Sequence, residues 1–301
     1  MRNNILLVAG LLLLIFAVVL WNWNNTQHNV APTNTSLTSS ALMPCHVVRS
    51  AGSIYGPQLV GNCKNAFPSY VASFNGTATI PDYIYVDRFG AINNSFTLSW
   101  WMYPTRIGNG VTGAYPWSED IVDIYNSTEY PQIYVEWRGD SSFNLNMCNG
   151  FYYNGTVDCR ESWIYLNNSM RWIQVAITYD MGNYTFYVNG KKIRKVYGGA
   201  GLPSITISNP KVYLSYLVPY STNAVDTVFG GYMSNVQIYN ASLTPSNITL
   251  LYSEGISGAP VDLGSIIGWW KLDGNANDYG GNNYTGKLIN GVTFATYENL
   301  S

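Results

Sequence analysis

The sequence predicts an all-β protein, a two-sheet antiparallel β-sandwich of the jelly-roll type, preceded by an N-terminal transmembrane helix. Apolar and polar residues alternate in short runs between turn residues, which is typical of strands that bury one face. Aromatic residues make up 15% of the 301 residues, with 25 Tyr and 10 Trp, and they favour strands. An uninterrupted apolar run at the N-terminus predicts the membrane helix.

This N-terminal apolar run extends over 17 residues, from Ile5 to Trp21. That length is close to the minimum for a helix that spans a bilayer. Arg2 marks the cytoplasmic side, and Trp21 and Trp23 stand where aromatic residues line a membrane interface. No small-residue cleavage motif follows. We therefore expect residues 1–23 to form an uncleaved signal-anchor, with a cleaved signal peptide or a pilin-like assembly helix as alternatives.

The rest of the chain divides into a stalk and one domain. Residues 24–44 are rich in Asn, Thr, Ser and Pro, which is typical of a flexible linker, and residues 45–301 suffice for one large β domain. Charged residues are only 11% and the net charge is −2, so the basic field of a nucleic-acid-binding protein is absent. One basic cluster predicts a solvated strand end, with contact to an anionic glycan or lipid as the alternative: Lys191, Lys192, Arg194 and Lys195.

The four cysteines form two local pairs, Cys45 with Cys63 and Cys148 with Cys159. Even pairs that are close in sequence favour disulfides in an oxidising environment. The first bond would close a staple loop over 45–63. No histidine lies near the second pair, which argues against a metal site there.

The clearest strand pattern lies in residues 171–193. Ile173, Val175, Ile177 and Tyr179 fall on one face of the first strand, and the alternation resumes after the turn at Asp180–Asn183. Asn189-Gly190 then supplies the two positive-φ positions of a tight hairpin turn. The segment therefore predicts an antiparallel meander.

Similar strand candidates recur along the domain with turn residues between them. We expect strands near Val71–Ala78, Tyr83–Val86, Phe96–Tyr103, Ile121–Tyr125, Gln132–Trp137, Ser142–Met147, Trp172–Tyr179, Tyr184–Val188, Val212–Leu217, Tyr232–Tyr239, Gly268–Leu272 and Lys287–Phe294. One short helix is also predicted, because Thr244 can cap it, Pro245 suits its first position and Gly255 can end it.

Four segments resemble the laminin-G-like jelly rolls of the concanavalin A-like lectin/glucanase superfamily. RWIQVAITYDMGNYTFYVNGKKI (Arg171–Ile193) resembles their central signature. ATIPDYIYVDRFGAINNSFTLSWWMYPT (Ala78–Thr105) and GGYMSNVQIYNASLTPSNITLLYSEG (Gly230–Gly255) resemble the strands before and after it. GWWKLDGNANDYGGNNYTGKLINGVTF (Gly268–Phe294) resembles the segment that usually opens such a domain. The resemblance covers roughly residues 70–295 and implies the sandwich fold.

The position of that last segment implies a circular permutation. Here the segment closes the chain, so the first and last strands of the domain are expected to be neighbours in a sheet. The resemblance leaves the activity open, since the superfamily includes lectins, adhesion modules, enzymes and structural subunits.

The enzyme hypothesis depends on carboxylate spacing. Retaining glucanases of the superfamily carry Glu-x-Asp-x-x-Glu on one strand, which places two glutamates across the scissile bond. The nearest segment here contains Glu119 and Asp123, which strict alternation places on one strand face, but it lacks a second glutamate at the required offset. We therefore predict a protein that is not an enzyme, with a divergent glycoside hydrolase as the least favoured alternative.

A calcium site is a further possibility for the turn at 273–278. Oxygen ligands of the kind that Ca²⁺ prefers cluster there on Asp273, Asn275, Asn277 and Asp278. The same residues also make ordinary turns through hydrogen bonds from side chain to backbone.

The candidate ligand-binding residues are aromatic. Alternation in Phe96–Tyr103 places Trp101 and Tyr103 on the face opposite to the core, and Tyr134 lies opposite its neighbours Ile133 and Val135. Flat aromatic rings stack on sugar C–H groups, so these three predict carbohydrate recognition. The alternative is that a loop or a second subunit covers these rings.

Twelve Asn-x-Ser/Thr sequons favour a glycosylated protein outside the cell, because N-glycans would solubilise a surface that is poor in charge. They begin at Asn24, Asn34, Asn75, Asn93, Asn126, Asn154, Asn167, Asn183, Asn240, Asn247, Asn283 and Asn299. The alternative is that these residues serve turns and strand surfaces. This Asn- and Tyr-rich composition suggests an archaeal or archaeal-virus source.

Together, these features predict a membrane-anchored surface protein whose domain lies outside the cell or on a virion. Its expected role is non-catalytic recognition or adhesion, with carbohydrate or a neighbouring surface protein as the partner. The alternative is a structural subunit of a surface layer, filament or viral particle that self-associates. Nucleic acid is not an expected partner, and Ca²⁺ is the one cofactor suggested.

Overall fold

The structure, a computed structural model, describes residues 44–49, 57–63, 67–76, 80–105, 118–125, 131–138, 143–149, 158–164, 171–196, 206–216 and 228–300. All of them belong to one compact unit, Met43–Ser301. The predicted anchor over 1–23 and the stalk up to residue 43 lie outside the described residues. Within the described ranges, the helices are too short or too polar to cross a membrane.

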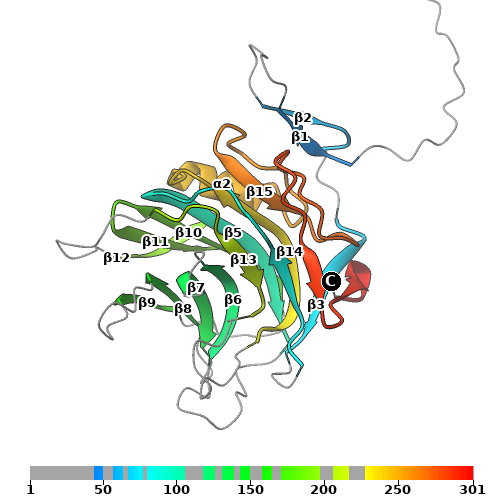
Figure 1. Ribbon diagram of the computed structural model, residues 1–301, viewed down its shortest axis with the longest axis horizontal. Coiled ribbons are helices and arrows are strands. Elements are labelled where there is room, and N and C mark those ends of the chain that lie inside the picture. The colour runs from blue at the N-terminus through cyan, green and yellow to red at the C-terminus, as the bar shows by residue number, and fades with distance from the viewer. Residues whose placement is uncertain are drawn as a thin grey trace, which may run out of the picture. The chain divides into compact units, whose positions relative to one another are not determined.

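Two antiparallel sheets pack face to face and form the predicted β-sandwich (Figure 1). The larger sheet has eight strands in the order β12-β11-β10-β5-β14-β3-β17, with β15 also paired to β14. Its strands are β3 (Tyr70–Asn75), β5 (Ser95–Pro104), β10 (Ile173–Asp180), β11 (Asn183–Val188), β12 (Lys191–Val196), β14 (Gly230–Tyr239), β15 (Ile266–Trp270) and β17 (Thr293–Thr296).

The smaller sheet has seven strands in the order β16-β4-β13-β6-β7-β8-β9. They are β4 (Tyr83–Val86), β6 (Ser118–Tyr125), β7 (Pro131–Arg138), β8 (Phe143–Asn149), β9 (Asp158–Ile164), β13 (Lys211–Leu214) and β16 (Lys287–Ile289). A separate hairpin of β1 (His46–Val48) and β2 (Gln58–Val60) precedes both sheets, and the 3-10 helix η1 (Tyr297–Leu300) follows them.

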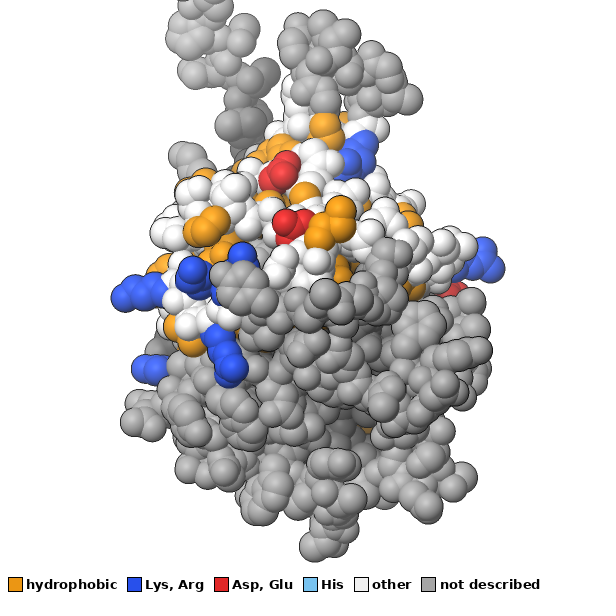
Figure 2. Space-filling model, turned by 90° about the vertical axis from the view of Figure 1, so that its left-hand side faces the viewer, with side chains coloured by type: hydrophobic (Ala, Val, Ile, Leu, Met, Phe, Trp, Pro, Cys, Tyr) orange, Lys and Arg blue, Asp and Glu red, His pale blue; other side chains and the backbone are white. Residues whose placement is uncertain are grey.

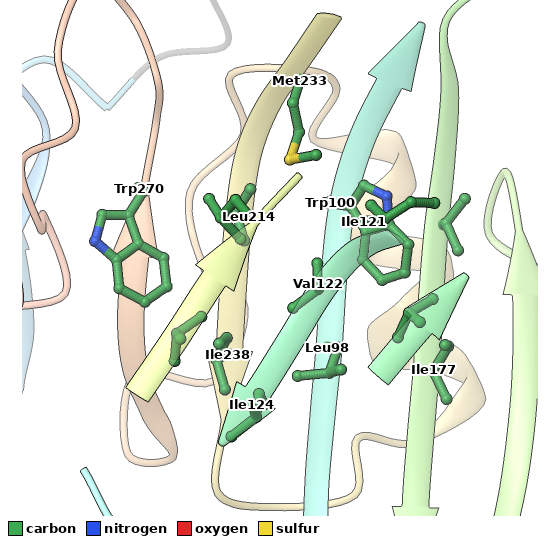
Figure 3. Close-up of a cluster of buried hydrophobic side chains, with 14 of the residues drawn as sticks. Leu98, Trp100, Ile121, Val122, Ile124, Ile177, Leu214, Met233, Ile238 and Trp270 are labelled. Atoms are coloured by element: carbon green, nitrogen blue, oxygen red, sulfur yellow. The ribbon is translucent and has the colours of Figure 1, made fainter. Parts of the chain in front are cut away.

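The main hydrophobic core lies between the two sheets. Figure 3 shows Leu98 and Trp100 from β5 and Val122 from β6 pointing into the same interior. The apolar residues of the alternation in 173–179 all lie in this core, as predicted. Inward positions are thus apolar on both sheets, and every second residue of each strand is left for an outer face.

Helix α2 (Pro245–Ser253) packs on the outer face of the larger sheet, and we call this side the helix-bearing face. Thr244 is its N-cap, and the Thr244 hydroxyl accepts a hydrogen bond from the Asn247 amide at 3.2 Å, so the predicted helix start is confirmed. A second apolar cluster forms under the helix from Ala176, Tyr187, Tyr239, Leu243, Ile248, Leu251, Ile266 and Trp269.

The turn between β11 and β12 lies close to this helix. Asn189 and Gly190 have φ of 49° and 72°, so the predicted turn with two positive φ angles is confirmed. A Cβ atom on Gly190 would lie 2.8 Å from the Cβ of Tyr252 on α2. Glycine is therefore required here both for the backbone conformation and for the approach of the helix.

The N-terminal hairpin is closed by a disulfide and is held to the same face by hydrogen bonds. Cys45 and Cys63 form the predicted bond, with a Cα–Cα distance of 4.7 Å. The Val47 amide donates to the Tyr279 carbonyl at 2.7 Å, and the Arg49 guanidinium donates to backbone carbonyl groups. The β8–β9 ladder pairs Cys148 with Cys159 directly across the strands, but their side chains lie outside the described part, so that disulfide stays a prediction.

Most predicted strands are confirmed within a few residues, and one is wrong. Lys287–Phe294 is not a single strand but β16 and β17, which belong to different sheets. Asn290 and Gly291, at φ of 53° and 97°, make the turn that separates them. Four strands were not predicted, namely β1, β2, β9 and β12.

The expected neighbourhood of the first and last strands is confirmed, because β17 pairs with β3 and closes the larger sheet. That the order of segments arose by circular permutation stays a prediction.

Candidate functional site

Trp101 and Tyr103 both lie on the helix-bearing face, as the alternation in β5 predicts. The Trp101 ring is half-buried because it stacks on Tyr252 of α2, with centroids 5.7 Å apart and planes 18° apart. One face of the indole is therefore already occupied. Tyr103 meets Trp172 and Tyr232 edge to face, each at 5.8 Å between centroids.

Further aromatic contacts connect Tyr103 and Trp172 to Tyr297, near the C-terminus, and to Phe67. Trp172 contacts Tyr297 at 5.9 Å, and Tyr297 stacks on Phe67 at 5.4 Å. Phe67 is the most exposed of them, at 77%. We call Phe67, Tyr103, Trp172, Tyr232 and Tyr297 the aromatic strip.

Tyr134, the third predicted binding residue, lies in the other sheet. It is part of β7 between the core residues Ile133 and Val135, and its ladder partner on β6 is Asp123. Its side chain lies outside the described part of the structure. Because the sandwich core separates the two sheets, Tyr134 cannot share one site with Trp101 and Tyr103.

The outer face of the smaller sheet carries a cluster of tyrosines that the sequence analysis missed. We call this cluster the tyrosine face, and it consists of Tyr83, Tyr85, Tyr125, Tyr213 and Tyr216. Tyr83 stacks on Tyr216 at 4.4 Å between ring centroids, and Tyr213 contacts the other four rings at 4.9 to 6.3 Å. All except Tyr125 are partly exposed.

Strand alternation places these rings outward. In β4 the core residues Ile84 and Val86 alternate with Tyr83 and Tyr85, and in β13 Tyr213 stands between core residues in the same way. The Cα register then pairs Tyr85 with Tyr213 across neighbouring strands. The Tyr-Ile-Tyr-Val run of β4 is a sequence signal that could have identified this face, because it places two tyrosines outward in one strand.

The hydroxyl groups of Tyr85 and Tyr213 stay neutral at physiological pH. Burial, reinforced by the hydrogen bond that the Tyr85 hydroxyl donates to Asp87 at 2.9 Å, raises the pKa of Tyr85 to about 12. Burial also raises the pKa of Tyr213. The ammonium group of Lys287 lies 5.7 Å from the centre of the Tyr85 ring. The face thus combines flat apolar rings with neutral hydroxyl groups and flanking charges.

Glu119 and Asp123 lie on opposite sides of β6, so the prediction that they share a face is wrong. A β-bulge between Asp120 and Val122 shifts the register by one residue. The Glu119 carboxylate is buried and accepts a hydrogen bond from the Gly230 amide of the opposite sheet at 3.1 Å. Asp123 alternates with the core residues Val122 and Ile124 and lies on the side of the tyrosine face. These two carboxylates do not form a catalytic pair.

In the proposed calcium turn, backbone amides use the carboxylate oxygens of Asp278. One oxygen accepts from Trp269 and Gly280, and the other accepts from Asn282 and Tyr284. This arrangement serves the turn, and the calcium site itself stays a prediction.

The other predicted ligands of that turn have backbone partners as well. Asp273 accepts from the Tyr70 amide at 2.7 Å, and Asn275 accepts from the Asn277 amide at 2.9 Å. Within the ranges that the structure describes, no group of three or more His, Cys, Asp or Glu residues is arranged to hold a metal ion.

Seven of the predicted sequons lie in described positions. Five of these asparagines are exposed and two are partly exposed, so none is buried; they are Asn75, Asn93, Asn240, Asn283 and Asn299, and Asn183 and Asn247. The remaining sequons, at Asn24, Asn34, Asn126, Asn154 and Asn167, lie outside the described residues. Glycosylation stays a prediction for all of them.

Two packed antiparallel sheets, closed by β17 and covered on one side by α2, define the class as an antiparallel β-sandwich consistent with a jelly roll. The chain belongs to the concanavalin A-like lectin/glucanases superfamily, which it matches over residues 75–249, more than half of its length. No curated protein matches the sequence.

Solved structures share this fold. The heptameric SAP-like pentraxin of Limulus polyphemus superposes with a TM-score of 0.56 at 13% identity, over 76% of this chain and 95% of the pentraxin. A Bacteroides ovatus protein, named for an expected carbohydrate-binding role, superposes with a TM-score of 0.53 at 18% identity. That match covers 82% of this chain and 64% of the other. At these identities the likeness shows the fold alone.

Proposed function

We propose that the protein is a non-catalytic carbohydrate-binding protein and that the tyrosine face is its binding surface. The observation that carries the proposal is the packing of five tyrosine rings on one outer face, where each ring lies 4.4 to 6.3 Å from at least one other. Pyranose rings present C–H groups that stack on aromatic faces, while their hydroxyl groups bond to neighbouring polar atoms. Neutral phenol groups can both donate and accept such bonds.

The location of the protein is part of the proposal. Residues 1–23 would anchor it in a membrane, residues 24–44 would form a stalk, and residues 45–301 would form the recognition domain outside the cell or on a virion. The disulfide between Cys45 and Cys63 supports an oxidising location. The exposed sequons at Asn75 and Asn283 suit glycosylation there.

The separation of Glu119 and Asp123 supports the non-catalytic part of the proposal. A retaining glycosidase needs two carboxylates about 5 Å apart on either side of the scissile bond. Glu119 instead points into the interior toward Gly230. Any hydrolysis of a bound glycan that was lost in Glu119→Gln would contradict this assignment.

The test is a glycan-array screen of the full chain in detergent, with and without Ca²⁺. A specific sugar should bind, and Tyr83→Ala or Tyr216→Ala should weaken binding about tenfold, the loss of one stacking contact of 1–3 kcal/mol. Trp101→Ala, on the opposite face, is the matched control and should bind normally. Loss in Trp101→Ala alone would move the site to the helix-bearing face, and a blank array from folded protein would refute carbohydrate binding. Binding that requires Ca²⁺ and is lost in Asp273→Asn would support the calcium turn.

A second candidate function is adhesion to a neighbouring surface protein or to a second copy of this chain. The exposed Phe67, stacked on Tyr297, favours it because large exposed aromatic side chains are enriched at protein contacts. Light scattering of the full chain in detergent tests the second copy. A concentration-dependent oligomer that dissociates in Phe67→Ser would support self-association, whereas a monomer at all concentrations would exclude it.

A further inference from the structure

The larger sheet has two edge strands of different chemistry, β12 and β17. Strand β12 contains four basic residues, and Figure 2 shows lysine and arginine side chains gathered on the side of the molecule where β12 lies. Strands β9 and β16, the edges of the smaller sheet, contain charged residues as well. The sequence of β17, Thr-Phe-Ala-Thr, has no charge. Charged side chains discourage an edge strand from pairing with another molecule, and β17 lacks them.

Half of the backbone groups of β17 point away from its neighbour β3. The Tyr297 amide, just beyond β17, donates to the Ser69 carbonyl at 3.1 Å. Residues 297 and 69 are therefore a hydrogen-bonded pair, and such pairs alternate with non-hydrogen-bonded pairs along an antiparallel ladder. It follows that the backbone groups of Phe294 and Thr296 are directed away from β3.

A second hydrogen bond supports this alternation. Tyr70 lies opposite Thr296 in the ladder, and the Tyr70 amide donates to the Asp273 side chain at 2.7 Å instead of to β17. Within the described part of the chain, no backbone hydrogen bond joins Phe294 or Thr296 to a further strand. Phe294 therefore presents both its N–H and its C=O at the edge. Thr296 presents its N–H, because its carbonyl opens the first i→i+3 turn of η1.

Exposed apolar side chains surround the same edge. Leu288 in β16, the strand that leads into β17, is exposed, and so is Tyr70 in β3. Phe67 is also exposed and stacks on Tyr297 at the end of β17. Phe294 itself packs against the main core but is only half-buried. Large apolar side chains that gather in one exposed region are typical of a protein–protein interface.

The complement of an unpaired edge is another extended strand, and β17 of a second copy has the required symmetry. A two-fold axis beside Phe294 places this residue opposite itself, so that each Phe294 N–H donates to the Phe294 carbonyl of the other copy. The pairing brings no like charges together, because β17 has none. The two half-buried Phe294 rings also become cross-strand neighbours and shield each other from water.

We propose that the protein forms a two-fold symmetric dimer in which the β17 strands of two copies pair in an antiparallel manner. Two eight-stranded sheets then join into one continuous sheet. The basic strand β12 stands at both ends of this sheet, where like charges oppose further addition, so the assembly stops at two copies. The inference rests on self-association, the second candidate function, and gives it a defined surface. It does not depend on the tyrosine face, which belongs to the other sheet.

The first experiment measures the mass of the full chain in detergent over a range of concentrations by analytical ultracentrifugation. Because Asn299 begins a sequon close to the end of β17, the protein comes from a host without N-glycosylation. The unmodified chain should form a dimer and nothing larger. Thr293→Lys adds a charge at the exposed start of β17 and should weaken the dimer about tenfold or more, because the two new lysines are diagonal neighbours across the axis.

Ser253→Lys is the matched control, since it adds the same charge at the exposed end of α2. It should leave the dimer unchanged. A dimer that is equally stable in Thr293→Lys and Ser253→Lys would refute edge pairing and leave self-association to another surface. A monomer at all concentrations would refute both, and neither result would bear on sugar binding at the tyrosine face.

Cysteine cross-linking tests the register. With Phe294 opposite itself, Thr293 of one copy lies opposite Ala295 of the other in a non-hydrogen-bonded pair, with Cα atoms about 4.5 Å apart and within reach of a disulfide. Thr293→Cys mixed with Ala295→Cys should therefore yield more cross-linked dimer on oxidation than either variant alone. Ser253→Cys mixed with Ala295→Cys should yield none. Equal yields from the two mixtures, or no cross-linking in the first, would overturn the proposed pairing.

Discussion

The two outer faces of the sandwich put aromatic residues to different uses. On the helix-bearing face, Trp269 and Tyr239 lie fully buried under α2 and the N-terminal hairpin, where they form a second core. On the tyrosine face, rings placed outward by the same alternation remain partly exposed and contact one another. Alternation therefore places an aromatic side chain outside the core, but what packs over it decides whether it stabilises the fold or is available to a ligand.

The largest difference between the two faces should be seen in the stability lost when one ring on each face is replaced. Trp269 is buried and its indole N–H donates to the Asn235 side chain at 2.8 Å, so Trp269→Ala should lower the free energy of unfolding by about 3–5 kcal/mol. Tyr216→Ala should cost about 1 kcal/mol, because that ring is partly exposed and loses mainly its contact with Tyr83. Urea unfolding measures both, and similar losses would contradict the distinction between the faces.

The disulfide should affect only the helix-bearing face. Cys45 and Cys63 are 18 residues apart, and opening a loop of that size should cost about 3 kcal/mol. Cys45→Ser with Cys63→Ser should also speed hydrogen exchange at the Val47 amide, which donates to Tyr279. Binding of a ligand to the tyrosine face should stay the same. A change in that binding would mean that the two faces are coupled.

The helix cap should have an effect of about 1 kcal/mol. Thr244→Ala removes the hydroxyl that accepts from the Asn247 amide. Ser246→Ala is the control, since the Ser246 hydroxyl lies 2.9 Å from that of Thr244 but is not the cap. Chemical denaturation should rank Thr244→Ala as the more damaging, and the reverse order would contradict the assigned cap.

The dependence of stability on pH should also differ between the two faces. Burial beside Trp269 and Tyr279 lowers the pKa of Lys271 to about 8, so the unfolded state binds more protons above that pH and stability should rise from about pH 8 to 10.5. On the tyrosine face, the pKa of Tyr85 is raised to about 12, so the folded state holds its proton longer and stability should fall from about pH 10 to 12.

Thermal unfolding against pH tests both slopes. Lys271→Met should remove the rise alone, and Tyr85→Phe should reduce the fall alone. If either variant flattened both slopes, the two groups could not be assigned to separate faces.

Much of the fold could be predicted because its signals are local. Alternation in 173–179, the turn at Asn189-Gly190 and the cap at Thr244 each depend on a few neighbouring residues, and the structure confirms all three. The pairing of the first and last strands followed from the family resemblance. The superfamily match ends at residue 249, before β15, β16 and β17.

The errors share a physical cause, since the register between strands is not a local property. The bulge in β6 moved Glu119 away from Asp123, and the bulge in β12 moved Lys195 toward Lys192. Strand β12 has little apolar pattern and is held by its ladder with β11. The split between β16 and β17, by contrast, has a local signal, because Asn290-Gly291 is a strong hairpin turn sequence.

The candidate site was only partly accessible to the same reasoning. Alternation correctly placed Trp101 and Tyr103 outside the core, but the stacking of Tyr252 on Trp101 depends on where α2 packs. Tyr83 precedes Tyr213 and Tyr216 by more than 120 residues in the sequence. Their rings meet only because of the order of the strands in the sheet. A site assembled in this way has no compact sequence motif.

The bulge in β12 also bears on aggregation. This strand ends the larger sheet, and the edge of a sheet exposes backbone groups that can pair with a strand of another molecule. An extra residue at Ile193 and four basic side chains make such pairing unfavourable, because the edge is irregular and like charges would face each other. Deleting Ile193 would straighten the edge, so this single deletion should promote fibril formation.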